Sequence, residues 1–509
     1  MSSSPIAFCG QAPPGVAESR ARPAWRALLP SWPLIVGLFA FARTLAAPGS
    51  VLSDPDTYLH IAAGRWILAH GALPVRDPFS YTMAGHTWVV HEWLAEVILA
   101  VVYALGGWSG LVLLTAACFA ASAALLTRLL LRRADPFSAV TAALLGCAVA
   151  LGHLLARPHL LALPLLVLWC GILIQARDDG KAPPLWLLPV IMLWANLHAS
   201  FMFGLMLAGF LGGEAVLRPA PGVGRRGEAR RWGLFVLLAG AAAMGTPNGI
   251  AGLIQPFRLV LMPVLQRDIT EWQSPDFQHA LFLEIWLLGL VALGFTTGLR
   301  LPPTRLLLLL GLCHMTLQHV RYVDLLGFVA PLALAAPLGA ALAERLRAVP
   351  FSAVGRGVIR LARPARRPAI ALGLALAALM SLPLLLSPVR RVNGPITPAG
   401  AFAVASEMGL LQKPVFNSYG FGGYLIFRGV APFIDGRAEL YGNAFLARYF
   451  KAQRDRRRLA RWLDRRHIAW ALLSPRDGAA LMLGGMPGWR QIYRDRYAIL
   501  AVRTPKPQR

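Results

Sequence analysis

The segment VLSDPDTYLHIAAGRWI, residues 51–67, follows closely after the first long apolar run of the chain, residues 28–47. Asp54 and Asp56 therefore stand where an apolar helix ends. Asp54 is a favourable N-cap for a following helix, and the proline between the two aspartates suits the first helical position. Asp56 and His60 are four residues apart, which places them on one helix face, where they can share a ligand or a proton. The pattern supports two interpretations: the aspartates form a helix cap, or they belong to the active site of an enzyme.

The composition is that of a membrane protein with many spans. Of the 509 residues, 56% are hydrophobic and 15% are charged, and the mean hydropathy is +0.55. A soluble protein carries about 25% charged residues, and apolar runs long enough to cross a bilayer recur along the first 390 positions. The net charge of +26 agrees with basic cytoplasmic loops, so no nucleic-acid partner is expected. The five cysteines form no disulfide or metal motif.

We expect about eleven membrane spans joined by Arg-rich connections. The expected spans are residues 29–47, 108–131, 136–155, 159–176, 184–198, 199–217, 232–248, 281–298, 303–319, 323–343 and 369–388. If the apolar stretch 93–106 does not cross the membrane, all of the basic connections fall on the cytoplasmic side; if it crosses, they lie outside. The positive-inside rule therefore favours an interfacial or half-inserted segment at 93–106.

The predicted fold class is mainly α, a transmembrane helical bundle with a small C-terminal α/β domain. Residues 1–28 are predicted to be a disordered cytoplasmic tail, and residues 29–388 the transmembrane module. The module includes a long first outer loop, residues 48–92, rich in aromatic residues, Pro and Gly; loops of this length are usually functional or disordered. Residues 389–509 are predicted to be the extracytoplasmic domain.

The C-terminal domain shows a mixed pattern of strands and helices. Residues 413–442 place short apolar strands against glycine turns, and an Arg-rich helix is expected at 444–466. Residues 468–475 are predicted to be another strand, and residues 489–503 a closing hairpin. This alternation predicts an α/β domain. Its glycines lack the spacing of a dinucleotide-binding or phosphate-binding loop.

The polar segments other than the Arg-rich connections fall on the outer side in this topology, at residues 54–93, 156–159, 194–198, 246–249, 268–277 and 319–322. Asp54 and Asp56 are the candidate catalytic residues. The candidate substrate-binding residues are His60, Arg65, Arg157, His159, Asn196, His198, Asn248, Glu271, Arg321 and Tyr322. His91 and Glu92 lack the second histidine of a zinc motif, and Glu92 and Glu96 are expected on the surface, as acidic side chains usually are.

Several motifs resemble those of a set of bacterial membrane proteins described as GT-C-like. These motifs are DPDTYLHIAAGRWIL, DPFSYT, HEWL, RPHLL, WANLH, EWQSPDF, GGYL and IDGR. An apolar first helix with an acidic pair at its outer end, a long first outer loop and an extracytoplasmic C-terminal domain also resemble the GT-C fold of membrane glycosyltransferases. That superfamily includes oligosaccharyltransferase catalytic subunits, protein mannosyltransferases and the aminoarabinose transferase of lipid A.

The resemblance implies a glycosyltransferase of the bacterial inner membrane with its N-terminus in the cytoplasm. Such an enzyme moves a sugar from a polyprenyl-phosphate donor to the hydroxyl of an extracytoplasmic glycan, lipid or protein, next to the membrane lipids. Asp54 or Asp56 would orient or deprotonate the acceptor hydroxyl. Arg157 and Arg321, at outer span ends, would offset charge on the departing lipid phosphate. Arg258 and Arg267 are the next candidates for the same role in this hypothesis.

The chain departs from the oligosaccharyltransferase pattern at two places. Those enzymes carry a second acidic pair that helps hold a divalent metal, where this chain has Arg-Pro-His at 157–159. Whether Asp54 and Asp56 hold a divalent cation, Mg²⁺ or Mn²⁺, therefore stays open. The acceptor-peptide motif Trp-Trp-Asp-Tyr-Gly is reduced to Tyr-Gly at 419–420, so peptide N-glycosylation is not implied.

Two other classes of function stay open. The chain could be a non-catalytic membrane scaffold or lipid-binding protein in envelope assembly, with the C-terminal domain as its docking part. A transporter is the third hypothesis. It ranks last because coupled transport needs ionisable groups at mid-membrane, and such groups are scarce in this chain. The enzyme and the scaffold differ in one structural respect, which is whether the outer acidic and basic groups converge on one lipid-accessible cavity.

Overall fold

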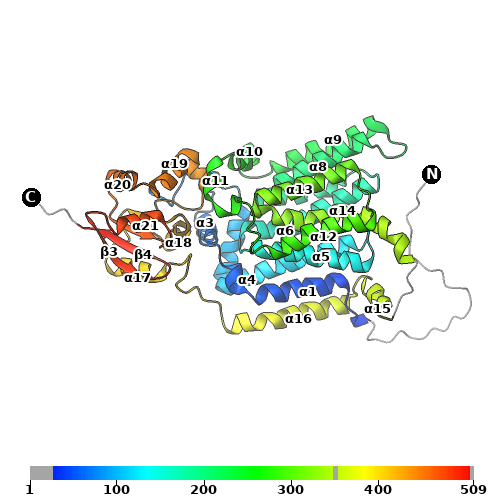
Figure 1. Ribbon diagram of the computed structural model, residues 1–509, viewed down its shortest axis with the longest axis horizontal. Helices are drawn as coiled ribbons and strands as arrows, with labels where there is room; N and C mark the ends of the chain where they lie inside the picture. Colours follow the sequence, from blue (N-terminus) through cyan, green and yellow to red (C-terminus); the bar gives the residue numbers. More distant parts are fainter. Residues whose placement is uncertain (1–26, 348–352, 505–509) are drawn as a thin grey trace, which may run out of the picture.

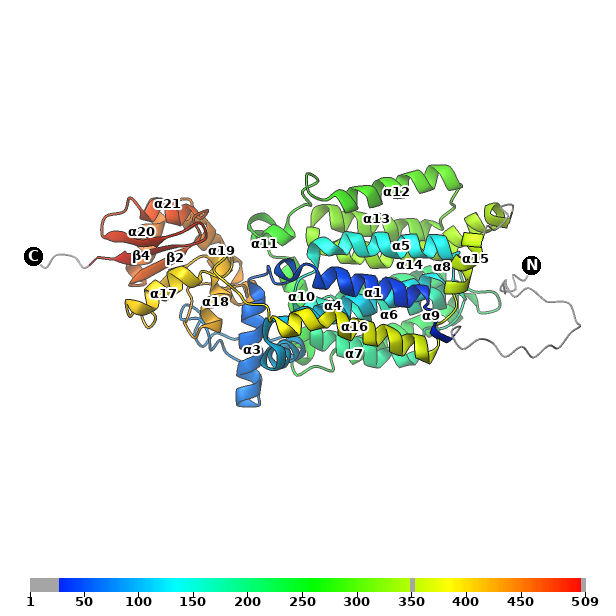
Figure 2. The same ribbon diagram turned by 90° about the horizontal axis from the view of Figure 1, so that it is seen from below.

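In the computed structural model, helices dominate residues 27–347 and 353–504, which are the residues that the structure describes. Figure 1 shows a bundle of long helices beside a smaller domain that leads to the C-terminus. Helix α3 (Asp56–His70) lies crosswise between these two parts, as Figure 2 shows from below. Almost all of the predicted disordered tail, residues 1–28, lies outside the described residues.

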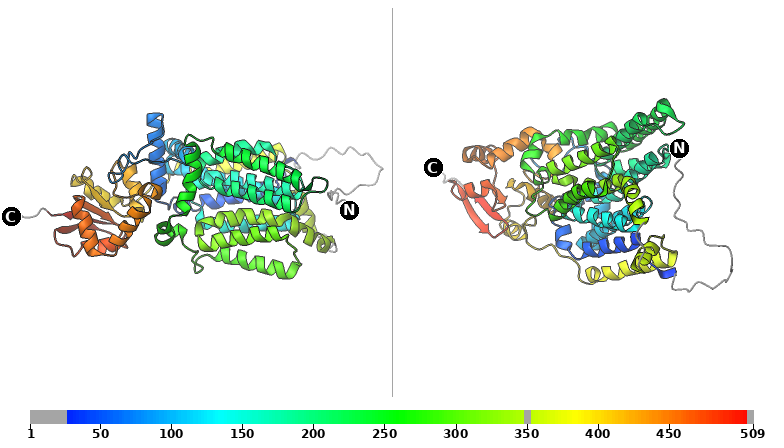
Figure 3. Two further views of the ribbon diagram at one scale, coloured as in Figure 1. Left: turned by 90° about the horizontal axis from the view of Figure 1, so that it is seen from above. Right: turned by 45° about the vertical axis from the view of Figure 1, so that its right-hand side comes forward.

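The bundle helices run side by side along the length of the molecule (Figure 3). Their bounds are α1 (Trp32–Leu45), α4 (Trp93–Leu130), α5 (Pro136–Ala150), α6 (Pro158–Asp178), α7 (Leu188–Leu197), α8 (Phe201–Leu217), α9 (Gly224–Ala243), α12 (Leu281–Thr297), α13 (Pro303–Gln318), α14 (Val323–Arg347) and α16 (Arg367–Leu386). Shorter elements are α2 (Pro48–Val51), η2 (Leu151–His153), η3 (Leu185–Leu187), α10 (Gly249–Val260), α11 (Pro263–Asp268), η4 (Thr270–Trp272), η5 (Val320–Tyr322) and α15 (Ala353–Leu361). Each expected span overlaps one of these bundle helices, so the polytopic helical architecture is confirmed.

Within the described residues, five segments are long and apolar enough to cross a membrane. They are α4, α5 with η2, α6, η5 with α14, and α16. Five more helices are apolar but shorter: α1, α7 with η3, α8, α10 and α12. The centre of the bundle is filled by fully buried aromatic side chains, among them Trp169, Trp194, Trp232 and Phe328. Burial of these large rings removes their apolar surface from solvent and fixes the positions of the helices.

Helix α4 consists of two helices that meet at a sharp break. Gly107 has φ 56° and ψ −145°, values that do not occur inside an α-helix and that glycine adopts without steric cost. Residues 93–106 therefore form a helix of their own, separate from the expected span that begins at 108. Leu105, in this first part, is 85% exposed. The placement of 93–106 at the membrane interface stays a prediction.

The structure corrects the expected start of one span. Helix α9 begins at Gly224, within the Arg-rich stretch that we expected to be a connection, whereas the prediction placed the start at 232. Arginine, alanine and glutamate are good helix formers, and their propensity extends the helix into the basic segment. Glu228 is buried there, and its carboxylate accepts a hydrogen bond from the backbone N–H of Ala220. The basic segment is thus folded onto the bundle.

The C-terminal domain is a four-stranded sheet covered by helices. Its elements are α17 (Ala399–Glu407), β1 (Val415–Asn417), η6 (Tyr419–Phe421), α18 (Gly422–Phe427), α19 (Ala438–Ala452), α20 (Arg456–Arg465), β2 (Trp470–Leu473), α21 (Gly478–Leu483), β3 (Trp489–Arg494) and β4 (Ile499–Arg503). The strand order is β1-β2-β4-β3, with β1 parallel to β2 and the other pairs antiparallel. The predicted strand near 468–475 and the closing hairpin at 489–503 are confirmed.

Two predictions for this domain were wrong. Residues 413–442 contain one short strand, and GGYLIF forms the helix α18. A Cβ atom at Gly422 would lie 2.1 Å from the carbonyl oxygen of Ile434, so α18 packs directly on that backbone. The expected helix 444–466 is two helices, α19 and α20. Asp455 divides them, since its carboxylate accepts the backbone N–H groups of Arg457 and Arg458 and so starts α20.

Helix α3 is fixed by close backbone contacts on two sides. A Cβ atom at Gly64 would lie 2.0 Å from the carbonyl oxygen of Glu96 in α4. On the other side, a Cβ atom at Gly423 in α18 would lie 2.7 Å from the carbonyl oxygen of Pro55. Only glycine fits at either point without displacement. The first turn of α3, which carries Asp56, is therefore held between the bundle and the C-terminal domain.

Candidate active site

The two aspartates at the start of α3 have different surroundings. The Asp54 carboxylate is buried, and its Oδ1 accepts the backbone N–H of Asp56 at 2.7 Å. Pro55 occupies the N-cap position of α3, which begins at Asp56, so Asp54 lies one residue before the cap that the sequence predicted for it. Oδ2 of Asp54 lies 3.1 Å from Nη1 of Arg157. Asp56, in contrast, lines a cavity, and its Oδ2 lies 3.3 Å from Nη2 of Arg157.

The guanidinium of Arg157 contacts three carboxylates from separate parts of the chain. It precedes α6, and besides Asp54 and Asp56 its guanidinium contacts Glu271 in η4, with Nη1 2.9 Å from Oε1. We expected Asp56 and His60 to share a ligand or a proton, but His60 makes a different contact. Nδ1 of His60 lies 3.4 Å from the buried carboxylate of Glu96, so His60 binds the wall of the cavity rather than Asp56.

Burial and neighbouring charges separate the proton affinities of these groups. Burial raises the pKa of Asp56, and repulsion from Asp54 adds to the rise, so that the pKa reaches about 8 although Arg157 opposes it. Burial also raises the pKa of Glu271, but Arg157 and Arg321 outweigh it and bring the pKa down to about 2. Asp56 can therefore exchange a proton near neutral pH, as a general base must, while Glu271 stays ionised.

The cavity lies at the junction of the bundle, the first outer loop and the C-terminal domain. It has a volume of about 130 Å³. Six of the predicted site residues line it, namely Asp56, His60, Arg157, His198, Glu271 and Arg321. Acidic and basic groups from distant segments thus converge on one cavity. Convergence on one cavity is one of the two conditions by which the sequence hypothesis separates an enzyme from a scaffold, the other being access of lipid to that cavity.

The C-terminal domain closes one wall of the cavity. A Cβ atom at Gly436 would lie 2.0 Å from Oδ1 of Asp56, so this backbone is packed directly against the carboxylate. The hydroxyl of Tyr419 donates to the carbonyl oxygen of Gly436 at 3.2 Å. Arg437 and Glu439 continue the same wall.

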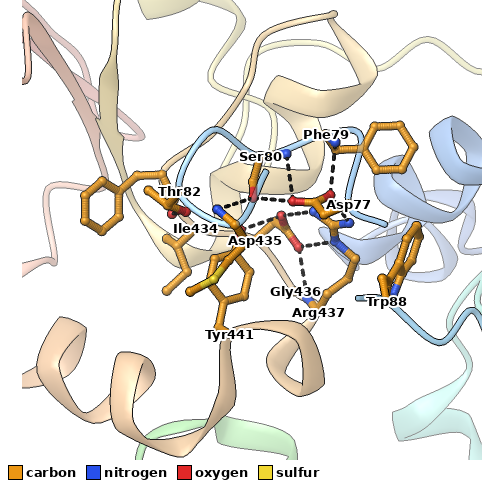
Figure 4. A network of polar contacts seen from close by, with 12 residues as sticks. Asp77, Phe79, Ser80, Thr82, Trp88, Ile434, Asp435, Gly436, Arg437 and Tyr441 are labelled. Atoms are coloured by element: carbon orange, nitrogen blue, oxygen red, sulfur yellow. Dashed lines mark hydrogen bonds and ion pairs between the residues drawn. The ribbon is translucent and has the colours of Figure 1, made fainter. Parts of the chain in front are cut away.

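Arg437 ties this wall to the first outer loop through a buried polar network (Figure 4). Its Nη1 donates to Oδ1 of Asp77 at 2.7 Å, and its Nη2 donates to Oδ2 of Asp435 at 2.7 Å. The hydroxyl of Tyr441 donates to the same Asp435 oxygen at 2.8 Å. The guanidinium also lies 4.6 Å from the centre of the Trp88 ring. A buried charge that is paired and stacked in this way fixes the geometry of its neighbours.

Several predicted site residues lie outside the cavity. Arg65 stacks on aromatic rings, and Asn196 accepts a hydrogen bond from the indole of Trp93 at 2.7 Å. Asn248 donates to the carbonyl oxygen of Val90 at 2.8 Å and so supports the cavity wall from behind. His159 bonds the carbonyl oxygen of His153, and the backbone oxygen of Tyr322 accepts the hydroxyl of Thr316. These residues hold helix ends and loops rather than face the cavity.

The sequence interpretation missed several residues that line the cavity, some of them within motifs that it had quoted. Trp88, Glu92 and Glu96 line the cavity, as do Gly436 and Arg437 of the IDGR motif. The expectation that Glu92 and Glu96 are surface residues was wrong, since the Glu92 side chain is 15% exposed and Glu96 is 4% exposed. Burial of an acidic side chain depends on tertiary contacts. The motifs HEWL and IDGR were the available signals.

The aspartate pair does not offer a vacant position for a divalent ion. The guanidinium of Arg157 already lies among the oxygens of Asp54, Asp56 and Glu271. Among the described residues, the group whose donor atoms lie within 4.8 Å of one another is His153, His159 and Asp324, which excludes these carboxylates. The donor set at the aspartates therefore fits an arginine and not a Mg²⁺ or Mn²⁺ ion.

Solved structures share this architecture. No family model and no curated protein sequence matches the chain. The oligosaccharyltransferase AglB from Archaeoglobus fulgidus, in complex with an inhibitory peptide and a dolichol-phosphate, is 14% identical, with 87% of this chain and 69% of that chain covered and a TM-score of 0.51. The apo form of the oligosaccharyltransferase from the same organism is also 14% identical, with 90% and 70% covered and a TM-score of 0.52.

A third structure, ArnT from Cupriavidus metallidurans bound to undecaprenyl phosphate, is 14% identical and covers 92% of this chain and 97% of its own, with a TM-score of 0.47. The two oligosaccharyltransferase structures establish the class of fold. The chain has the fold of these two oligosaccharyltransferases, as the resemblance to GT-C proteins predicted.

Proposed function

We propose that the protein is a membrane glycosyltransferase that moves a sugar from a polyprenyl-phosphate donor to the hydroxyl of an extracytoplasmic acceptor. One observation carries the proposal: Asp56, with its pKa raised to about 8, shares a cavity with Arg321 at the junction of the bundle and the C-terminal domain. A base and a cation in one cavity are what transfer from a lipid phosphate to a hydroxyl requires. AglB, which has the same fold, was solved with a dolichol-phosphate bound.

In the proposed reaction, ionised Asp56 accepts the proton of the acceptor hydroxyl. The acceptor oxygen then forms a bond to the anomeric carbon of the sugar, and the bond between that carbon and the phosphate oxygen breaks. The products are the glycosylated acceptor, the lipid phosphate and protonated Asp56. Position matters as much as charge here, because a base acts only within hydrogen-bond reach of the proton that it accepts.

Arg321 is the cation that we assign to the lipid phosphate. It lines the cavity, its guanidinium lies 4.2 Å from the centre of the Trp272 ring, and within the described ranges it forms no ion pair. Its charge is therefore available to a leaving group that gains negative charge. Arg157, in contrast, already contacts three carboxylates. This assignment separates the two arginines that the sequence treated alike.

We place the enzyme in the bacterial inner membrane, with the cavity on the outer side. The test is mass spectrometry of envelope lipids and glycans from cells with the wild-type protein, with no protein and with Asp56→Asn. We expect one glycan, lipid or protein to lose a defined sugar mass in the second and third strains, with accumulation of the matching lipid-phosphate sugar. Identical profiles in all three strains would refute the enzyme.

The same strains distinguish the scaffold hypothesis. A scaffold needs the folded protein but no base, so Asp56→Asn would restore the wild-type profile in full. If the profile changes without the protein but not with Asp56→Asn, the scaffold is correct and the transferase is not.

A further inference from the structure

The surroundings of Arg157 are unusual because one guanidinium holds three carboxylates. Nη1 contacts both Asp54 and Glu271, at 3.1 and 2.9 Å, while Nη2 contacts Asp56 at 3.3 Å. The side chains of Arg157, Asp54 and Asp56 are 17%, 10% and 18% exposed. The three carboxylates come from the segment before α3, from the first residue of α3 and from η4, and all of them contact Arg157, so its guanidinium is the centre of the cluster.

Charge explains why a cation is needed at this centre. Three acidic groups that face one another in a partly buried site repel, and such a cluster persists only with a compensating cation. In proteins, clustered carboxylates are a common set of ligands for a divalent ion such as Mg²⁺, Mn²⁺ or Ca²⁺. Arginine is an alternative, since its planar fork of donors contacts more than one carboxylate at once and stays charged.

The geometry shows which solution this chain uses. The carboxylate oxygens point at the nitrogens of Arg157, and a divalent ion placed among them would meet the guanidinium, which repels it. The His153–His159–Asp324 group does not involve these oxygens. The aspartates therefore have their cation covalently attached to the chain.

We propose that Arg157 is a built-in cation that takes the position of the divalent ion which the oligosaccharyltransferase pattern implies at Asp54 and Asp56. Arg157 is then a positioning residue, which holds Asp56 toward the cavity. Two consequences follow. The wild-type protein needs no divalent ion, and removal of the guanidinium leaves three carboxylates around an empty space that suits Mn²⁺. The first consequence rests on the proposed function, and the second does not.

The test is Mn²⁺ binding to the purified full-length protein, measured as loss of the electron paramagnetic resonance signal of free Mn²⁺. We expect Arg157→Ala to bind one Mn²⁺ at least about tenfold more tightly than the wild-type protein. The double variant Arg157→Ala/Asp56→Asn should lose this gain. Arg321→Ala is the matched control, because it removes a cation from the same cavity without touching the three carboxylates, and it should show no gain.

The opposite results would overturn the proposal. Wild-type protein that binds one Mn²⁺ tightly, and loses it on Asp56→Asn, would show that the aspartates hold a metal beside Arg157. An equal gain in Arg321→Ala and Arg157→Ala would show a general effect of cavity charge. The wild-type measurement needs no variant, so it decides the question even if Arg157→Ala does not fold. No sugar donor is present, so failure of the transferase proposal would leave this result unchanged.

Discussion

At the scale of single residues, the two aspartates divide the roles that the sequence left open. Asp54 accepts the backbone N–H of Asp56 just before α3 and pairs with Arg157, while Asp56 faces the cavity with a raised pKa. The candidate residues Asp54, Asp56, Arg157, Glu271 and Arg321 could be named from the sequence because they lie in polar segments between apolar runs. Which of them face the cavity could not be predicted, since that depends on side-chain directions.

We predict that Asp56→Asn inserts and purifies normally but loses transfer activity by about a hundredfold or more, because asparagine cannot accept the proton. Asp54→Asn should keep the hydrogen bond from the N–H of Asp56, which an asparagine oxygen also accepts, and lose less activity. The measurement is the initial rate with a lipid-phosphate sugar, alongside the melting temperature. If both variants keep wild-type rates, the pair has a structural role only.

The pH dependence of kcat/KM follows from the same residue. Asp56 acts as a base only when ionised, so with its pKa raised to about 8 the rate should rise with pH and level off above that value. Repulsion from Asp54 raises this pKa, and Asp54→Asn should therefore move the rise to lower pH. Profiles of both proteins between about pH 6 and about pH 10 provide the test. A wild-type profile that is flat through pH 8 would contradict the assignment of the base.

Arginines near the cavity should differ in their importance to turnover. We predict that Arg321→Gln raises the barrier by about 2–4 kcal/mol, as the loss of a preorganised charge contact does. Arg258→Gln and Arg267→Gln should have wild-type rates, because Arg258 is exposed and Arg267 pairs with Asp268 at the surface. Steady-state rates with saturating donor measure the effect. Equal rates for all three variants would remove the phosphate assignment.

At the scale of elements, long apolar helices were predictable, and short elements were not. Apolar length alone predicts a bundle helix, whereas α18 and the division between α19 and α20 depend on tertiary contacts of Gly422 and on the Asp455 cap. The crossing of α3 and α4 depends on Gly64 in the same way. No local pattern in the sequence shows which glycine is a contact point.

We predict that Gly64→Ala destabilises the protein by about 1–3 kcal/mol, because the added methyl group would lie 2.0 Å from the Glu96 carbonyl and force α3 away from α4. Gly289→Ala in α12 is the control, since a Cβ atom there meets nothing within 4 Å. In a helix, alanine is intrinsically favoured over glycine. Thermal unfolding in detergent should show a lower melting temperature for Gly64→Ala alone; equal values would contradict the close packing.

At the scale of the whole molecule, the sequence predicted a helical module and a C-terminal α/β domain but not their junction. Arg437 contacts Asp77 across 360 residues of chain, and Gly436 packs against Asp56. Such long-range contacts leave no periodic signal. The sequence could therefore predict the cavity residues that the bundle contributes, but not those that the C-terminal domain contributes.

The orientation in the membrane is a further prediction at this scale. In a variant with its cysteines replaced by serine, Arg226→Cys in α9 and Arg490→Cys in β3 are exposed positions on opposite ends of the molecule. The basic connections predict that α9 begins in the cytoplasm. A membrane-impermeant thiol reagent applied to intact cells should label position 490 only. Labelling at 226 would instead make residues 93–106 a true crossing.

The ion pair between Arg437 and Asp77 has a consequence for the biosynthesis of the protein. A ribosome makes Asp56 and Asp77 early, but the residues that complete the cavity wall emerge only after the last bundle helix, α16, has been made. A nascent chain thus carries the proposed base, Asp56, without the wall that encloses it. If the proposed function holds, truncated or stalled products would be inserted but inert, and activity would arise in a single late step, when the C-terminal domain docks.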